Sequence, residues 1–115
     1  MNESDCIFCK IVRKEIPARE VAREADAVAF SDLNPKAPTH VLVIPARHAA
    51  NLGDFASQAS PHELGNLLAL AAKVGREASP SGYRVVINEG LDAGQSVFHL
   101  HLHVLAGRAL AWPPG

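Results

Sequence analysis

Three histidines alternate with aliphatic residues near the end of the chain, in the segment His99–Leu105, which reads HLHLHVL. In an extended strand successive side chains point to opposite faces, so the three imidazoles would share one face at steps of about 6.6 Å. The apolar residues between them would pack into a core on the other face: Phe98, Leu100, Leu102 and Val104. A strand that only has to pack does not need three side chains that titrate near neutral pH. The segment therefore predicts a strand that belongs to an active site.

Four further segments have the composition of strands. They are rich in aliphatic residues and most are bounded by turn-forming ones. These segments are Val21–Glu24, Ala27–Ser31, His40–Ile44 and Tyr83–Asn88. Because consecutive short strands can pair antiparallel, they predict, together with the histidine strand, a five-stranded antiparallel sheet.

One long helix and one short helix accompany these strands. Ser60, Pro61 and Glu63 indicate where the long helix begins, because Ser-x-x-Glu is a capping box and proline fits the first helical turn. An apolar stripe at near-helical spacing follows and consists of Leu64, Leu67, Leu68, Ala71 and Ala78. The segment Ile7–Arg13 predicts a short N-terminal helix, whereas residues 46–59 show little beyond a helical turn near Leu52–Phe55. These elements predict an α+β fold.

The size and composition are those of one globular domain over residues 1–115. The chain is 48% hydrophobic and 20% charged, and it shows no internal repeat or linker. Its formal net charge of -1 argues against nucleic-acid binding as the main activity. Charged residues, histidine or glycine interrupt every apolar run before membrane-spanning length. The acidic start leads into no signal-like apolar segment, so we expect a cytoplasmic protein that does not bind membranes.

The histidine strand is compatible with two chemistries and with a chance arrangement. Alternate histidines can chelate a metal ion, or one imidazole can act as a nucleophile while another handles a proton. The spacing alone does not separate these two readings. The sequence Gly94-Gln95-Ser96 lies just before the strand and offers backbone amides and a hydroxyl. Such a loop suits an anion, and this context favours chemistry on a phosphate.

The two cysteines, Cys6 and Cys9, form a Cys-x-x-Cys pair. Redox pairs of this kind usually start a helix inside a βαβ pattern, which is missing here. Two thiolates and two imidazoles would instead make a closed tetrahedral zinc site. The alternative is a pair of reduced cysteines that only pack.

Taken together, these motifs resemble the histidine triad (HIT) superfamily and, within it, bacterial-type histidine triad nucleotide-binding (Hint) proteins with Cys-x-x-Cys. The histidine segment matches the family motif at every position, and the resemblance extends from about Asp5 to Gly115. The other matching segments are Ile7–Ile11, Lys14–Ala18, Ala37–His40, Asn88–Gly90 and Trp112–Gly115. The resemblance implies a HIT-like α+β fold, with a five-stranded antiparallel sheet, one long helix and a short N-terminal helix.

The resemblance also implies an activity, the hydrolysis of purine nucleoside 5′-phosphoramidates through a covalent nucleotidyl-histidine intermediate. Adenosine and guanosine derivatives are the expected substrates, with aminoacyl-adenylate as a related one. His101 would be the nucleophile, and the other catalytic residues would be His103, His40 and Ser96. Besides His101 and His103, the nucleotide would contact Ile7, Phe8, Ile11, Phe30, Asp32, Leu33, Asn88, Gly94, Gln95 and Ser96.

By the same resemblance, a structural zinc ion would be bound by Cys6, Cys9, His48 and His99, and no organic cofactor is expected. The chain would form a homodimer, with the tail that carries Trp112 near the active site of the partner. Two other functions remain open at this point. One is a dinucleoside polyphosphate hydrolase or nucleotidylyltransferase of the same superfamily, and the other is a non-catalytic nucleotide-binding scaffold.

Overall fold

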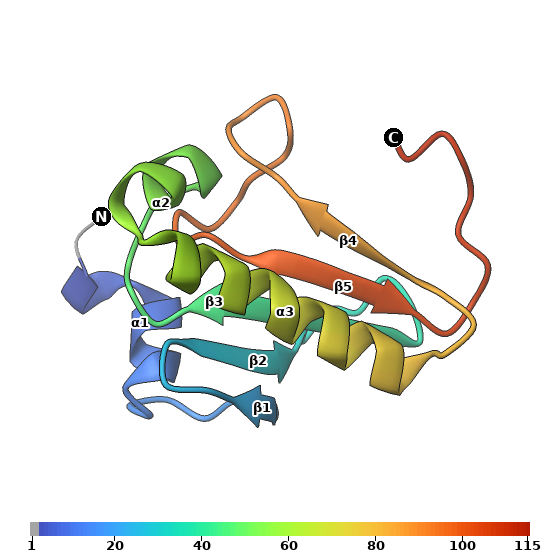
Figure 1. Ribbon diagram of the computed structural model, residues 1–115, viewed down its shortest axis with the longest axis horizontal. Helices are drawn as coiled ribbons and strands as arrows, with labels where there is room; N and C mark the ends of the chain where they lie inside the picture. Colours follow the sequence, from blue (N-terminus) through green and yellow to red (C-terminus); the bar gives the residue numbers. More distant parts are fainter. Residues whose placement is uncertain (1–2) are drawn as a thin grey trace.

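The computed structural model describes residues 3–115 and has the predicted α+β architecture (Figure 1). The helical elements are η1 (Glu3–Asp5), α1 (Ile7–Val12), α2 (Leu52–Gln58) and α3 (Pro61–Ala78). The strands are β1 (Glu20–Arg23), β2 (Ala27–Ser31), β3 (Thr39–Pro45), β4 (Tyr83–Ile87) and β5 (Leu102–Ala106). Among the helices of the described residues, none has both the length and the apolar character needed to cross a membrane.

The five strands form one antiparallel sheet in the order β1-β2-β3-β5-β4. The predicted five-stranded antiparallel sheet is therefore confirmed. The last strand in the sequence inserts between β3 and β4, so that His103 pairs with Leu42 on one side and with Val86 on the other. Hydrogen bonds on both sides hold the backbone of this strand inside the sheet, next to the edge strand β4.

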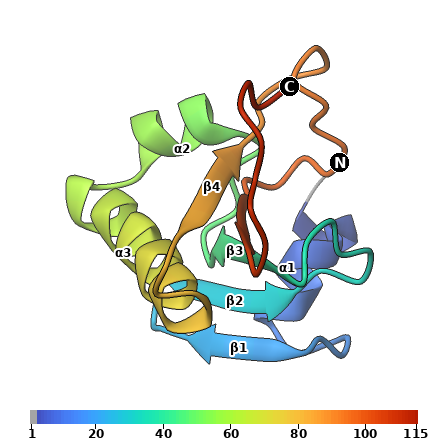
Figure 2. The same ribbon diagram turned by 90° about the vertical axis from the view of Figure 1, so that its right-hand side faces the viewer.

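Helices cover both faces of the sheet, as Figure 2 shows for α3 on one side and α1 on the other. Leu100, Leu102 and Val104 are buried on the α3 side, in the main core. A second apolar cluster on the α1 side includes Phe8 and Phe30. This alternation places His103 of β5, and His101 just before the strand, on the face that α1 covers, as the two-residue period predicts.

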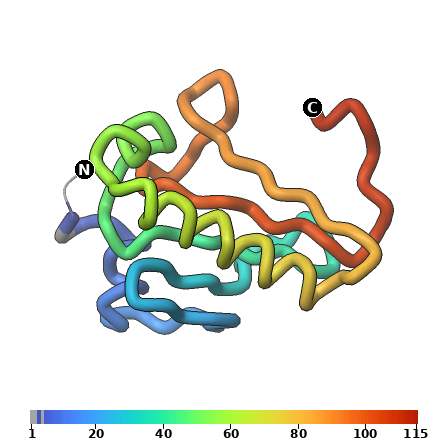
Figure 3. The backbone as a smooth tube through the Cα atoms, in the orientation of Figure 1, coloured from blue at the N-terminus to red at the C-terminus, as the bar shows by residue number. Residues whose placement is uncertain are grey.

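The start of the histidine strand differs from the prediction. The strand β5 begins at Leu102, because Leu100 donates its backbone N–H to the carbonyl oxygen of Ala49 (2.8 Å) and the chain before β5 turns away from the ladder. Phe98 was predicted to lie in the core, but 47% of its surface is exposed. In Figure 3 the connection between β4 and β5, drawn in orange, loops away from the sheet before it returns.

The long helix begins at its predicted capping box, in which Glu63 donates its backbone N–H to Ser60 Oγ (3.1 Å). Its buried stripe differs in part from the prediction. Leu68 and Ala78 are exposed. Leu68 lies beside the buried stripe, next to Leu67, and Ala78 is the last residue of the helix. The buried residues of the helix are Leu67, Leu70, Ala71, Val74 and Gly75.

The helix α2 occupies the part of the sequence that showed little pattern. The side chain of Asn51 accepts a hydrogen bond from the backbone N–H of Asp54 and caps the helix. Phe55 is its one buried residue. A helix that buries a single side chain has almost no apolar stripe, so its periodicity is too weak to predict it.

Candidate active site and metal centre

His101 is held in one tautomer by the backbone. Its Nδ1 lies 2.9 Å from the carbonyl oxygen of His99, which can only accept a hydrogen bond. The proton of the neutral ring is therefore on Nδ1, and Nε2 keeps its lone pair. Phe8 packs edge-on against the ring, with 5.3 Å between centroids, and only 7% of His101 is exposed. The side chain thus offers an oriented, nucleophilic nitrogen.

His103 is the next side chain on the same face, with its ring centroid 5.0 Å from that of His101. Its Nδ1 lies 2.9 Å from Nε2 of His40 on the neighbouring strand β3. Burial, together with the nearby His101 and His40, lowers the pKa of His103 to about 4. Burial also lowers the pKa of His40, although the Asp32 carboxylate acts in the opposite direction. Both imidazoles are therefore neutral at neutral pH.

The protons of this pair can be assigned from one backbone amide. Lys36 donates its N–H to His40 Nδ1 (3.0 Å), so the proton of His40 must be on Nε2. His40 Nε2 then donates to His103 Nδ1. The same Nε2 lies 3.5 Å from Asp32 Oδ2. The remaining proton of His103 is consequently on Nε2. The cluster presents a lone pair on His101 and an N–H donor on His103.

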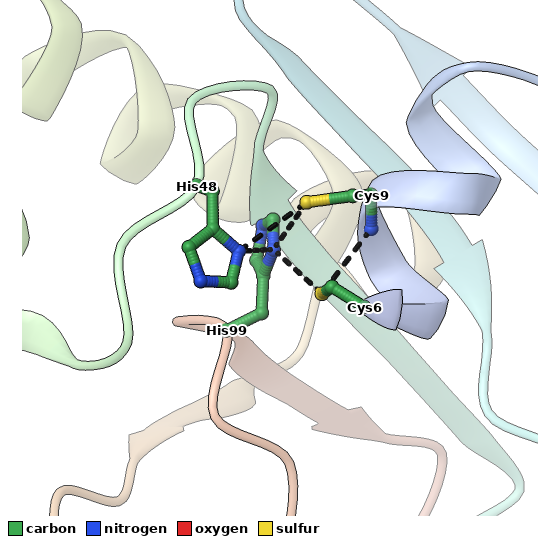
Figure 4. Close-up of side chains that lie close together, drawn as sticks. All are labelled: Cys6, Cys9, His48 and His99. Atoms are coloured by element: carbon green, nitrogen blue, oxygen red, sulfur yellow. Dashed lines mark hydrogen bonds between the residues drawn. The ribbon is translucent and has the colours of Figure 1, made fainter. Parts of the chain in front are cut away.

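The side chains of Cys6, Cys9, His48 and His99 form a second cluster, shown in Figure 4. Helix α1 supplies both thiols, because Cys6 is its N-cap and Cys9 lies one turn later. His99 Nδ1 lies 3.3 Å from Cys6 Sγ, 3.5 Å from Cys9 Sγ and 3.2 Å from His48 Nδ1, and His48 Nδ1 lies 3.3 Å from Cys9 Sγ. The edges of a tetrahedral zinc site with two sulfur and two nitrogen ligands are about 3.3 to 3.8 Å long. The cluster therefore has suitable ligands and spacing for zinc.

The tautomer of His99 also suits a metal ligand. Its Nε2 lies 2.9 Å from the carbonyl oxygen of Pro45, so Nε2 carries the proton and Nδ1 presents its lone pair to the thiols. Burial lowers the pKa of His99 to about 4. Burial, and then the neighbouring Cys6, raises the pKa of the Cys9 thiol to about 12. A metal cation in the cluster would compensate the charge of buried thiolates.

Asp32, His40 and His103 also place potential ligand atoms within 4.8 Å of one another. The proton assignment argues against a metal ion there. His40 Nδ1 accepts the N–H of Lys36, so its Nε2 carries a proton and has no lone pair for a metal. These three residues therefore form a hydrogen-bonded chain rather than a metal centre.

The predicted nucleotide-binding residues are arranged unevenly around this site. Phe8, Ile11 and Phe30 are buried together, whereas Ile7 is half exposed and Leu33 is 92% exposed. Gly94 and Ser96 are exposed in the connection between β4 and β5, and Asn88 is half-buried at its start. Within residues 3–115, the side chains of Asn88 and Ser96 make no hydrogen bond to the histidine cluster. Their predicted roles stay predictions.

Gln95 is turned into the protein. Its side chain is buried, its Oε1 accepts the N–H of Gly90 (3.0 Å), and its Nε2 donates to the carbonyl oxygens of Ala50 (2.6 Å) and Val97 (3.1 Å). Both donors of the amide are thus used within the chain. We interpret Gln95 as a residue that shapes the loop, and its predicted contact with nucleotide would have to use the one free lone pair of its oxygen.

Comparisons with known proteins agree with this geometry. A family model described as HIT domain matches residues 13–110. The 14 kDa zinc-binding protein of Zea mays is 44% identical over 117 residues, covering 100% of this chain and 91% of the maize protein. A HIT family hydrolase from Legionella pneumophila superposes with a TM-score of 0.86 at 42% identity, covering 96% of this chain and 100% of that one. A zinc-bound histidine triad family protein from Mycobacterium smegmatis superposes with a TM-score of 0.81 at 30% identity, covering 93% of this chain and 78% of that one.

Proposed function

The chain belongs to the HIT family, and on that premise we propose that it hydrolyses the P–N bond of purine nucleoside 5′-phosphoramidates through a nucleotidyl-histidine intermediate. The observation that carries the proposal is the contact between His101 Nδ1 and the carbonyl oxygen of His99 (2.9 Å), which leaves Nε2 as the nitrogen with the lone pair in the neutral ring. The name of the Legionella protein, a HIT family hydrolase, supports hydrolysis in general. The phosphoramidate and purine specificity rests on the resemblance of the sequence motifs.

In the first step, His101 Nε2 attacks the α-phosphorus, a bond forms between them and the P–N bond breaks. The amine leaves with the electron pair of that bond and takes up one proton from the solvent, which the water of the second step returns. The carbonyl oxygen of His99 accepts the Nδ1–H of His101 and so stabilises the positive charge that develops on the ring. The Nε2–H of His103 can donate to a phosphoryl oxygen that gains charge.

In the second step, water attacks the same phosphorus and the bond to His101 breaks. The nucleoside monophosphate leaves, water gives up one proton, and the imidazole returns to its starting tautomer. Over both steps one proton is taken up and one is released. The products are therefore one amine and one nucleoside monophosphate for each water consumed.

The test is turnover of adenosine and guanosine 5′-phosphoramidates beside diadenosine polyphosphates, with wild type, His101→Ala and His62→Ala. His62 is exposed on α3 and serves as the matched control. We expect phosphoramidates to be the best substrates and His101→Ala to lose at least about 10³-fold in kcat, because the nucleophile is gone. Preferred cleavage of the polyphosphates would favour the other enzyme class, and nucleotide binding without turnover would favour a scaffold. Full activity of His101→Ala would contradict the mechanism.

We propose in addition that Cys6, Cys9, His48 and His99 bind a structural zinc ion. The ligand atoms and their spacing support this, as do the names of the maize and Mycobacterium relatives. When bound, the metal would neutralise the thiolates and tie helix α1 to the chain before β5. Metal analysis of protein purified without chelator should find one zinc per chain in wild type and in His62→Ala, and none in Cys9→Ser. A metal-free wild type would refute this proposal.

We also propose that the chain forms a homodimer whose tail reaches the active site of the partner. Trp112 is 79% exposed, so most of its surface is accessible for such a contact. The tail is fixed to its own β4, because Arg84 donates to the carbonyl oxygen of Ala111 (2.9 Å) and lies over the Trp112 ring. Light scattering during gel filtration tests the dimer, and a monomer at assay concentration would contradict it.

A further inference from the structure

The chain leaves the sheet after β5 and passes close to the loop that precedes β3. Gly107 has φ +100°, and a Cβ at this position would lie 2.8 Å from Cβ of Pro38. The lack of a side chain lets the two backbones approach each other. The next residue, Arg108, reaches across this contact and donates from Nη2 to the carbonyl oxygen of Lys36 (3.0 Å). Its Nη1 donates to the carbonyl oxygen of Ala109 (3.0 Å), which orients the guanidinium.

Lys36 is the residue whose backbone N–H determines the tautomer of His40. From this arrangement we propose that Arg108 is a positioning residue, which holds Lys36 in place so that its N–H stays on His40 Nδ1. The inference rests on the proposed function for its effect on catalysis. Arg108 is outside the histidine segment and was not among the candidate residues from the sequence.

Near Lys36 the loop is also held by the buried Ala37 and by hydrogen bonds of its own. Asn34 donates its N–H to Asp32 Oδ1 (2.8 Å), and the Lys36 ammonium group donates to the carbonyl oxygen of Asn34 (2.9 Å). Both contacts lie within the loop itself. The Asp32 N–H bonds the carbonyl oxygen of His40 (2.9 Å) and joins the two ends of the loop. Arg108 is therefore the residue that ties Lys36 to a distant part of the chain.

Loss of the contact between Arg108 and Lys36 would change the tautomers of His40 and His103. Without the Lys36 N–H, His40 can carry its proton on Nδ1 and present a lone pair at Nε2. His103 would then carry its proton on Nδ1, in order to donate to His40, and its Nε2 would lose the N–H. The site would lose the donor that faces the phosphate. Asp32 Oδ2, 3.5 Å from His40 Nε2, still favours the original tautomer, so we expect a partial change.

The experiment compares full-length, metal-loaded wild type with Arg108→Ala, Arg108→Lys and the control Arg76→Ala. Arg76 is an exposed arginine in the last turn of α3. The first readout is the ¹⁵N NMR spectrum of the histidine rings without substrate. We expect His40 to be protonated on Nε2 in wild type and in Arg76→Ala, and to show a mixture of tautomers in Arg108→Ala. Arg108→Lys should restore part of the wild-type spectrum, because an ammonium group can donate to one carbonyl.

The second readout is steady-state kinetics on adenosine 5′-phosphoramidate. We expect Arg108→Ala to lower kcat about tenfold with little change in KM, since the donor matters most where charge develops. An unchanged His40 tautomer in Arg108→Ala would overturn the inference, and an unchanged kcat despite a changed tautomer would overturn its catalytic part. If Arg108→Ala does not fold, Arg108→Met is measured in its place, because methionine keeps the apolar stem and has no donor; a spectrum and kcat identical to wild type would then also overturn the inference. Failure of the proposed function is distinguishable, because it would remove turnover from wild type while the spectra still test Arg108.

Discussion

Gln95→Ala should lower the stability of the protein, and we do not expect it to remove a contact with the nucleotide. The substitution removes three hydrogen bonds, to Gly90, Ala50 and Val97. A net contribution of about 0.5 to 1.5 kcal/mol for each bond gives about 1.5 to 4.5 kcal/mol. The partner residues are half-buried, so water can replace part of the loss, and we expect about 2 to 3 kcal/mol. With an unfolding entropy of about 2.1 cal/mol/K per residue, the Tm should fall by about 8 to 12 °C.

Thermal unfolding followed by circular dichroism measures this shift, and kinetics on adenosine 5′-phosphoramidate are recorded in parallel. Ser96→Ala is the matched control for the Tm alone, since Ser96 is exposed in the same loop and makes no hydrogen bond within residues 3–115. Its Tm should stay within about 1 °C of wild type. If Gln95→Ala kept the wild-type Tm and only raised KM, the reasoning would be refuted and Gln95 would be a ligand contact.

Three further predictions concern pH and packing. Burial lowers the pKa of His103 from its ordinary value near 6.5 to about 4, so the unfolded chain binds a proton more tightly. The contribution of His103 to stability is therefore complete above pH 6.5 and is lost as the pH falls toward 4; denaturant titrations should show this slope, and His103→Asn should reduce it. Gly75→Ala should lower the free energy of unfolding by about 2 kcal/mol, because the new Cβ overlaps the Tyr83 ring. In a Tyr83→Ala background, adding Gly75→Ala should cause no such further loss. Ser60→Ala should lower the Tm by about 4 °C through loss of the α3 cap, and an unchanged Tm would show that the cap is dispensable.

Periodicity predicted the parts of the fold that repeat. The alternation around His101 correctly separated the histidine face from the core face, because side chains of extended backbone alternate whatever the strand boundary is. The same pattern placed Phe98 in the core, where the structure exposes it. Nothing in the local sequence indicates that the chain before Leu102 bonds to the loop at Ala49 instead of to the sheet. Strand ends depend on such distant partners.

The sequence indicated which side chains gather at the candidate site, but it did not indicate where the protons of the histidine rings lie. The histidine triplet was predicted from its spacing, whereas the roles of His101 and His103 came from the family resemblance, and the proposed zinc ligands came from the cysteine pair together with that resemblance. The proton positions depend on the backbone groups of Lys36, Pro45 and His99, which no sequence motif describes. The orientation of Gln95 could not be predicted from the sequence either, because its side-chain amide is oriented by the backbone carbonyl groups around it. Arg108 was missed since its partner lies 72 positions away.

His99 contributes its imidazole to the metal cluster and its peptide oxygen to His101. Every amino acid has that oxygen, so any residue at position 99 keeps the acceptor for His101. Almost every substitution at that position would remove the candidate metal ligand. A chain of this kind could therefore lose the proposed zinc site and still keep the hydrogen bond that orients His101, the proposed nucleophile. In a relative without both cysteines and the first histidine of the triplet, the backbone could still hold the middle histidine in the same tautomer.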